Sequence, residues 1–169
     1  MPKGLKPTSG VIVISSQITE SSADTFTSEK VDLQLNVLDR EVFVVTAADI
    51  DVRPPLNRTD TRTQVSMSIS TTERDSVGGI DKSNVLAAAN ITTQNVGDTC
   101  VVSNHYSSTE SPHAQLEYIG IIATNDFYLN IVGQNNGAVL AGNARLWGYR
   151  AQADAATFAA LTQSELLSA

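Results

Sequence analysis

The sequence is poor in residue types that carry chemistry or staple small folds. It holds one cysteine and two histidines in 169 residues, and charged residues make up 17%, below the average of about 25%. A single cysteine excludes an internal disulfide. Cys100 lies in an apolar context typical of a strand, so we expect a buried structural thiol rather than a catalytic thiolate.

Long apolar runs are also missing. The run near the N-terminus, Val11–Ile14, is only four residues long. A signal peptide needs an apolar segment of about 7–15 residues, and a membrane helix needs about 18. We therefore expect synthesis in a cytosol, with no signal peptide and no transmembrane segment.

The chain lacks a basic cluster. Its net charge is −7, from 18 acidic and 11 basic residues. The densest basic group is Arg53, Arg58 and Arg62, and it is diluted by Asp51 and Asp60. A protein that binds duplex nucleic acid needs a basic stripe to displace counterions from phosphates. We therefore expect no direct, sequence-specific contact with nucleic acid.

Uncharged polar residues replace the missing charge. Ser, Thr, Asn and Gln number 17, 17, 11 and 8, which is 53 of 169 residues. This composition excludes a coiled coil or a bundle of long helices, which are rich in Ala, Glu, Lys, Leu and Arg. The apolar content of 41%, with clear patterning, argues against a disordered chain.

Alternation of apolar and polar residues, the signal of a half-buried strand, recurs along the chain. It predicts eight strands, over residues 11–16, 31–37, 41–52, 62–72, 100–106, 115–123, 127–134 and 143–152. Two connections are expected to be hairpin turns: Asp39-Arg40 between the second and third strands, and residues 124–126 between the sixth and seventh. Good helix formers at residues 85–89 also suggest a short helix over 83–89.

The pattern becomes helical at the C-terminus. Asp154 is expected to cap a helix over 155–167, where apolar residues recur at three- and four-residue spacing. About eight antiparallel strands and a short C-terminal helix predict an all-β fold, a jelly roll or β-sandwich barrel. We expect one domain over residues 1–169, with an arm at 1–10 and a helical tail at 154–169. Strand number does not separate a jelly roll from an immunoglobulin-like sandwich.

One group of residues could hold a transition metal. His105, Glu110 and His113 offer two nitrogens and a carboxylate, donors that zinc or iron accepts. The intervening residues 107–112 are loop-like, so this spacing has no fixed geometry. A solvent-exposed loop is therefore expected, and no metal site is predicted.

A second, acidic group could hold calcium. Asp49 and Asp51 share one strand face and could act with Asp75 and Asp81. The pattern is sparser than in calcium loops, so we expect a solvated strand end. Nucleophile and phosphate-loop motifs are absent from the sequence. We therefore predict no catalytic residue, no cofactor and no small-molecule substrate, and we do not expect an enzyme.

Two aromatic residues stand out near the end of the last strand. Trp147 and Tyr149 are two residues apart and so project to one face. Such a pair could stack on a sugar, but an anchor in the core or at a subunit interface is the favoured interpretation. With the apolar side chains of the tail, the interface candidates are Trp147, Tyr149, Phe158, Leu161 and Leu166.

These features together resemble a virion protein. The closing strand, residues 144–150 (Ala-Arg-Leu-Trp-Gly-Tyr-Arg), and the Ala-rich tail after it resemble the end of a small jelly-roll capsid protein. In size and acidity the whole chain is similar to the single, vertical β-barrel capsid proteins of tailless, membrane-containing icosahedral dsDNA viruses. It departs from small RNA-virus coat proteins, which usually begin with an arm rich in Arg and Lys.

The resemblance implies a structural virion protein made in the host cytoplasm. Barrel-to-barrel contacts would join shell subunits into oligomeric capsomers. The implied partners are further copies of the chain, a second capsid protein and an underlying viral membrane. Three alternatives stay open. Two are a virion decoration or accessory protein and a carbohydrate-binding β-sandwich module. The third is a metal enzyme built on the two histidines.

Overall fold

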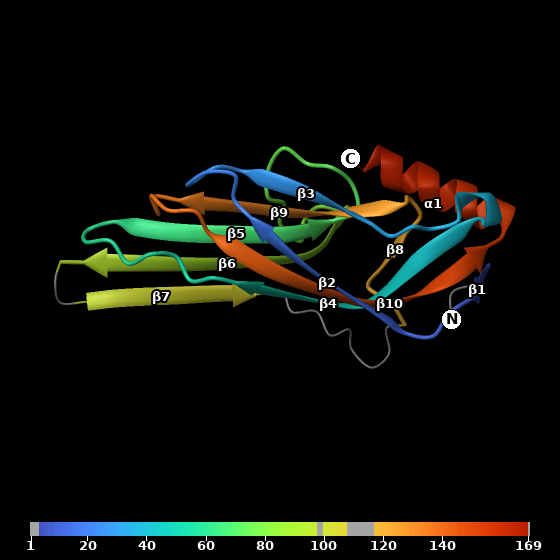
Figure 1. The fold of residues 1–169 in the computed structure, drawn as a ribbon, viewed down its shortest axis with the longest axis horizontal. Helices are drawn as coiled ribbons and strands as arrows, with labels where there is room; N and C mark the ends of the chain where they lie inside the picture. Colours follow the sequence, from blue (N-terminus) through green and yellow to red (C-terminus); the bar gives the residue numbers. More distant parts are fainter. Residues whose placement is uncertain (1–3, 98–99, 108–116, 169) are drawn as a thin grey trace.

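The computed structural model shows two antiparallel β-sheets and one helix (Figure 1). It describes residues 4–97, 100–107 and 117–168. The strands are β1 (Leu5–Pro7), β2 (Ile12–Thr19), β3 (Thr27–Asp32), β4 (Glu41–Val52), β5 (Arg62–Ser70), β6 (Val85–Val96), β7 (Cys100–Ser107), β8 (Gly120–Ile122), β9 (Asp126–Gln134) and β10 (Ala141–Ala153). A short 3-10 helix η1 (Val37–Asp39) precedes β4, and α1 (Ala155–Leu167) closes the chain.

The strand order is that of a jelly roll. Sheet A has the order β1-β10-β4-β8, with β2 also paired with β10, and sheet B has the order β3-β9-β5-β6-β7. The pairs β2·β10, β3·β9, β4·β8 and β5·β6 are nested, first with last. One long hairpin rolled into a barrel produces this nesting. The structure thus confirms the all-β prediction, and its topology separates a jelly roll from an immunoglobulin-like sandwich.

Both hairpin predictions are wrong. β3 lies in sheet B and β4 in sheet A, so the chain changes sheets between them. Likewise β8 lies in sheet A and β9 in sheet B. The expected strand over 31–37 ends early because Gln34 has a φ of 52°, which breaks an extended chain. Leu33 and Leu35 are still buried, which explains their misleading alternation.

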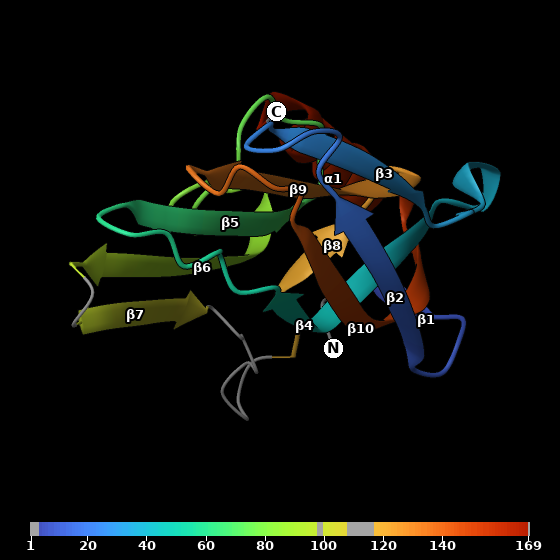
Figure 2. The ribbon, with the colours of Figure 1, turned by 60° about the vertical axis from the view of Figure 1, so that its left-hand side comes forward.

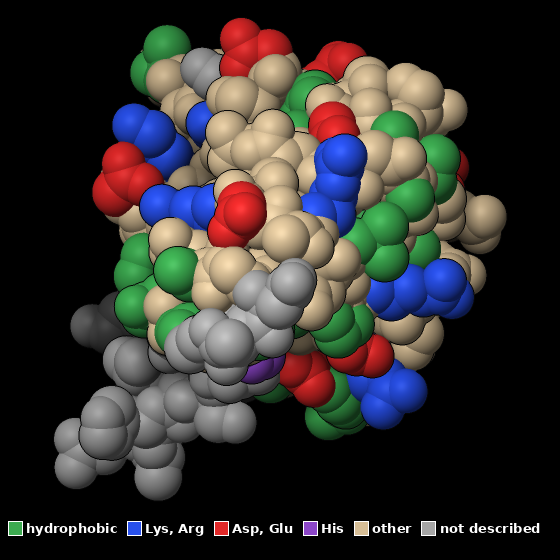
Figure 3. All heavy atoms as spheres, turned by 90° about the vertical axis from the view of Figure 1, so that its left-hand side faces the viewer, with side chains coloured by type: hydrophobic (Ala, Val, Ile, Leu, Met, Phe, Trp, Pro, Cys, Tyr) green, Lys and Arg blue, Asp and Glu red, His purple; other side chains and the backbone are tan. Residues whose placement is uncertain are grey.

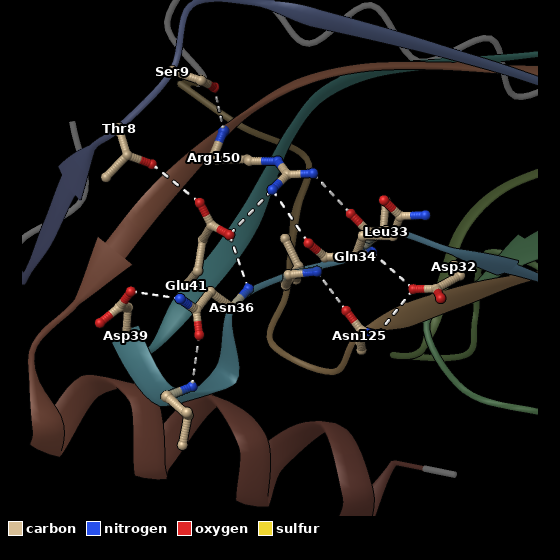
Figure 4. A network of polar contacts seen from close by, with 12 residues as sticks. Thr8, Ser9, Asp32, Leu33, Gln34, Asn36, Asp39, Glu41, Asn125 and Arg150 are labelled. Carbon is tan, nitrogen blue, oxygen red and sulfur yellow. Dashed lines mark hydrogen bonds and ion pairs between the residues drawn. The ribbon is translucent and has the colours of Figure 1, made fainter.

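A polar network holds this crossing between the sheets (Figure 4). The Arg150 guanidinium on β10 donates to the carbonyl oxygens of Leu33 at 2.9 Å and Gln34 at 3.2 Å. It also pairs with the Glu41 carboxylate at 3.2 Å. One side chain therefore ties the β3–β4 connection to the middle of sheet A.

The helix expected over residues 83–89 is a strand. β6 runs from Val85 to Val96, and Ala87 and Ala89 are buried opposite Ile69 and Met67 of β5. Small residues fit between the two sheets here, so tertiary packing overrides their helix propensity.

The sheets enclose one core, and α1 covers a second, smaller one. The main cluster includes Phe43, Met67 and Phe127 between the sheets. The second cluster lies under α1 on the outer face of sheet A and includes Val42 and Val44. As predicted, Asp154 caps the helix, accepting a hydrogen bond from the Thr157 backbone N–H at 2.7 Å. No helix among the described residues is long and apolar enough to span a membrane.

Candidate interaction surface

The outer face of sheet B is lined with uncharged polar side chains. Register places Ser66 of β5 between Asn90 of β6 and Val132 of β9 in one row across the sheet. Gln64, Thr92 and Gln134 form the next row. We call this surface the amide–hydroxyl face; its uncharged polar residues are Ser28, Gln64, Ser66, Ser68, Asn90, Thr92, Gln94, Asn104, Asn130 and Gln134. Ser68, Thr92 and Asn130 are buried within it, and the charged side chains of Arg62, opposite Gln94, and Lys30, on β3, lie at its margins.

Hydrogen bonds within the face hold its side chains in place. Gln64 Nε2 and Asn90 Nδ2 both donate to Ser66 Oγ at 3.0 Å. Thr92 Oγ1 donates to Asn90 Oδ1 at 3.1 Å. Because these contacts fix rotamers in advance, a partner that binds the face would have less side-chain entropy to remove.

A groove borders this face beside β7. It encloses about 830 Å³ and is lined by Ser66 and Asn90 on its polar floor, and by Ile80, Tyr106 and Val132. The connection between β5 and β6 forms one wall, and the backbone N–H of Gly78 donates to Ser68 Oγ at 3.3 Å. The surface is therefore hollowed along the side next to β7.

β7 is the outermost strand of sheet B, and β6 is the only described strand that pairs with it. Figures 1 and 2 show it at the rim of the sandwich. Every side chain from Val101 to Tyr106 is exposed, Tyr106 by 70%. Sequence alternation predicts this strand but not its edge position. No local signal marks the edge, because residues 100–107 contain no proline and no Asp, Glu, Lys or Arg, the residues that edge strands commonly carry.

The outer face of sheet A is different, because α1 covers one end of it. Phe158 and Leu161 of the helix pack against the cluster that contains Val42 and Val44. The uncovered end carries charge instead: Asp49 and Asp51 on β4 and Arg145 on β10 are exposed, and Asp49 lies directly opposite Arg145. One end of this face is therefore covered by α1, and the other end carries charged side chains that water solvates.

A buried carboxylate attaches α1 to the sheet. Glu165 is only 7% exposed. Its Oε2 accepts from the backbone N–H groups of Ala123 at 2.8 Å and Thr124 at 3.1 Å, and its Oε1 accepts from Thr124 Oγ1 at 2.9 Å. Burial raises the pKa of Glu165 above its ordinary value, although these hydrogen bonds act to lower it.

The five interface candidates fall into different environments. Tyr149, Phe158 and Leu161 are partly buried against the cluster under α1, so part of their apolar surface is used within the chain. Leu166 is 63% exposed. Trp147 is half-buried, with the Arg145 guanidinium 5.7 Å from the centre of its ring. Their role between subunits stays a prediction.

Of the residues weighed as transition-metal ligands, only His105 lies in the part of the chain that the structure describes. His105 is exposed on β7, whereas Glu110 and His113 lie outside the described residues, as does the Cys100 side chain. Asp49 and Asp51 lie on sheet A. In the part of the chain that is described, no three His, Cys, Asp or Glu side chains are placed to hold a metal ion.

The end of the molecule where β6 meets β7 shows no basic field (Figure 3). Lys and Arg side chains are interspersed with Asp and Glu among uncharged surface. This distribution matches the diluted arginines of the sequence.

Comparison with known proteins gives only distant structural likenesses. No protein-family model matches the chain, and no curated protein sequence matches it. A solved chain from Desmodium yellow mottle tymovirus is similar over 92% of this chain and 98% of that chain, with 13% sequence identity and a TM-score of 0.33. A likeness at that score carries no argument about family or function.

Proposed function

We propose that the protein is a structural shell subunit, a jelly-roll domain that associates with further copies through its uncharged sheet surface. The amide–hydroxyl face of sheet B carries the proposal. Its central rows across β5, β6 and β9 contain no ionisable side chain, in a chain with a net charge of −7.

The physical reason is electrostatic. Two copies of an acidic protein repel each other wherever their carboxylates meet. Contact between copies therefore costs least where carboxylates are missing. Amides and hydroxyls both donate and accept hydrogen bonds, so one such face can pair with another. A protein that functions as a free monomer would more often place Lys and Glu on an exposed sheet.

The resemblance of the sequence to single β-barrel capsid proteins extends the proposal to the virion. There the subunit would form capsomers with a second capsid protein, above a viral membrane. The jelly-roll fold is compatible with this role, but lectin domains and cupins share it, so the fold alone does not assign it. The uncharged surface of sheet B, and not the fold, supports a role in assembly.

Isosteric variants test the face directly. Gln94→Glu with Gln134→Glu adds two carboxylates to sheet B, and Gln17→Glu with Asn143→Asp adds two to sheet A. All four side chains are exposed, and both variants have the same net charge. We expect wild-type protein to form species larger than dimers in sedimentation velocity, and shell fragments in negative-stain microscopy. The sheet B variant should lose them, and the sheet A variant should keep them.

Two results would contradict the proposal. The first is wild-type protein that forms nothing larger than a dimer at high concentration across a range of salt. The second is equal assembly of both variants. A strict monomer would instead favour an accessory or carbohydrate-binding module, which a glycan array would then examine.

A further inference from the structure

Within residues 4–97, 100–107 and 117–168, β7 has one unpaired edge and two exposed faces. It extends sheet B beyond β6, and its outer edge pairs with no described strand. Both of its faces are also open, because Val101 is 53% exposed on one face and Val102 is 48% exposed on the other. A strand in this state offers unpaired backbone N–H and C=O groups together with apolar side chains.

The opposite edge of the same sheet is protected in the usual way. β3 carries Glu29, Lys30 and Asp32 in six residues, and Lys30 pairs with Asp126 of β9 at 3.1 Å. Charges on an edge strand discourage pairing with another chain. The eight residues of β7 include no Asp, Glu, Lys or Arg. The β3 edge of sheet B is therefore protected by charge against pairing with another chain, and the β7 edge is not.

We propose that β7 pairs antiparallel with β7 of a second copy, across a two-fold axis at Asn104, and joins two five-stranded B sheets into one continuous sheet. The proposal deepens the proposed function and rests on it for the expectation of self-association. Strand addition of this kind is a general mode of recognition that uses backbone hydrogen bonds.

The sequence of β7 fits a second copy of itself. Val102, Asn104 and Tyr106 share the outer face, since they lie opposite Gln94, Thr92 and Asn90 of β6. Antiparallel pairing about Asn104 places Val102 of each copy opposite Tyr106 of the other, and amide opposite amide at the centre.

The other face of the strand fits as well. The same register places Ser103 of each copy opposite His105 of the other, so no carboxylate meets a carboxylate between two chains of net charge −7. A two-fold contact requires such a self-complementary pattern, and an aromatic opposite a β-branched residue is a favourable cross-strand pair.

Charge complementation at Asn104 tests the pairing. Asn104→Glu sets two carboxylates against each other at the axis, and Asn104→Lys sets two ammonium groups there. Because like charges directly opposite repel, each variant alone should dimerise at least about tenfold more weakly than wild type in sedimentation velocity. An equal mixture of the two should restore dimers. Gln17→Glu and Gln17→Lys on β2, alone and mixed, are the matched controls and should behave as wild type.

Cross-linking tests the register. In a Cys100→Ser background, Asn104→Cys places two thiols opposite each other at a separation that suits a disulfide. Ser103→Cys is the control, because residue 103 would face residue 105 of the other copy. Oxidation should link Asn104→Cys into dimers and leave Ser103→Cys largely monomeric.

The outcomes separate this contact from the proposed shell. Assembly that is insensitive to charge at Asn104, or a wild-type protein without dimers, overturns β7 pairing. Cross-linking through Ser103→Cys but not Asn104→Cys overturns the stated register and axis. A dimer that responds to Asn104 but never grows larger supports β7 pairing while contradicting the shell.

Discussion

The outer faces of the two sheets differ in what covers them and in the charge that they carry. On sheet A, α1 covers Val42 and Val44, and the exposed end bears charges that water solvates. On sheet B, hydroxyl and amide groups form hydrogen bonds with one another within and between β5 and β6, and the central rows carry no charge. The outer face of sheet A is partly covered by the chain's own helix, whereas the outer face of sheet B is uncharged along its central rows and its side chains are held by hydrogen bonds. Substitutions on sheet A should therefore cost folding stability, whereas those on sheet B should cost association.

Removing the contacts of α1 with sheet A should have the largest effect on stability. Phe158→Ala with Leu161→Ala removes the two side chains through which α1 packs on the sheet. Both are only partly buried, so we expect a loss of about 2–4 kcal/mol in the free energy of unfolding, below the sum for two fully buried residues. Urea unfolding followed by circular dichroism measures it.

The matched control lies on the same helix. Leu166→Ala with Leu167→Ala removes two side chains that are 63% and 78% exposed, so the free energy of unfolding should change by less than about 0.5 kcal/mol. If this pair costs as much as the first, the helix does not cover sheet A as described. Loss of assembly without loss of stability would support Leu166 as an interface residue.

A smaller effect is expected where the pairing of β10 with β4 shifts in register after Trp147. A Cβ on Gly148 would press on the Val44 carbonyl oxygen and approach the Phe43 ring within 2.6 Å. Gly148→Ala should therefore lower the free energy of unfolding by about 1–3 kcal/mol.

Gly10 supplies the control for that substitution. A Cβ there would meet nothing within 4 Å, so Gly10→Ala should be close to neutral in thermal melts. Equal melting temperatures for the two alanine variants would mean that sheet A accommodates a methyl group at residue 148, where β10 shifts in register against β4.

Strand positions follow from the sequence because alternation is a local property of a half-buried strand. The expected strand over 41–52 coincides with β4, and Asp154 caps α1 as expected. Sheet membership is not local. A turn such as Asp39-Arg40 can close a hairpin or lead the chain to the other sheet. Here the chain changes sheets, and Arg150, more than a hundred residues away, donates hydrogen bonds to the connection between them.

The candidate surface was predictable only in part. Alternate serines at 66, 68 and 70 indicate an uncharged outer face; all three lie on that side of β5, but Ser68 and Ser70 are buried and only Ser66 is partly exposed. That β7 is an edge strand depends on the order β5-β6-β7 in the completed sheet, and no local pattern encodes it. The grouping of Tyr106 with Ile80 beside the groove likewise requires the fold, because 26 positions of sequence separate them.

The smallest expected effect concerns pH and the attachment of α1. Burial raises the pKa of Glu165 in the folded chain, so folding disfavours its ionised form. Its contribution to stability is full below the unfolded pKa and is lost as pH rises through the folded pKa. The pKa of Asp24 shifts in the opposite direction. Burial acts to raise this pKa, but hydrogen bonds from the backbone of Gly137 and Asn136 lower it below its ordinary value. The contribution of Asp24 to stability is therefore lost as pH falls through its folded pKa.

Glu165→Gln isolates the first of these effects. The glutamine Oε1 can still accept from the Ala123 and Thr124 backbone, and its Nε2 can donate to Thr124 Oγ1, so the contacts survive while the charge is removed. Relative to this variant, wild-type protein should gain free energy of unfolding as pH falls from neutral toward the unfolded pKa of a glutamate. Parallel unfolding curves at each pH, with Asp24→Asn as the variant of opposite sign, measure it. A wild-type protein that instead loses stability relative to Glu165→Gln over that range would show that the carboxylate is better solvated than its burial implies, and that sheet A is less completely sealed than the contrast with sheet B requires.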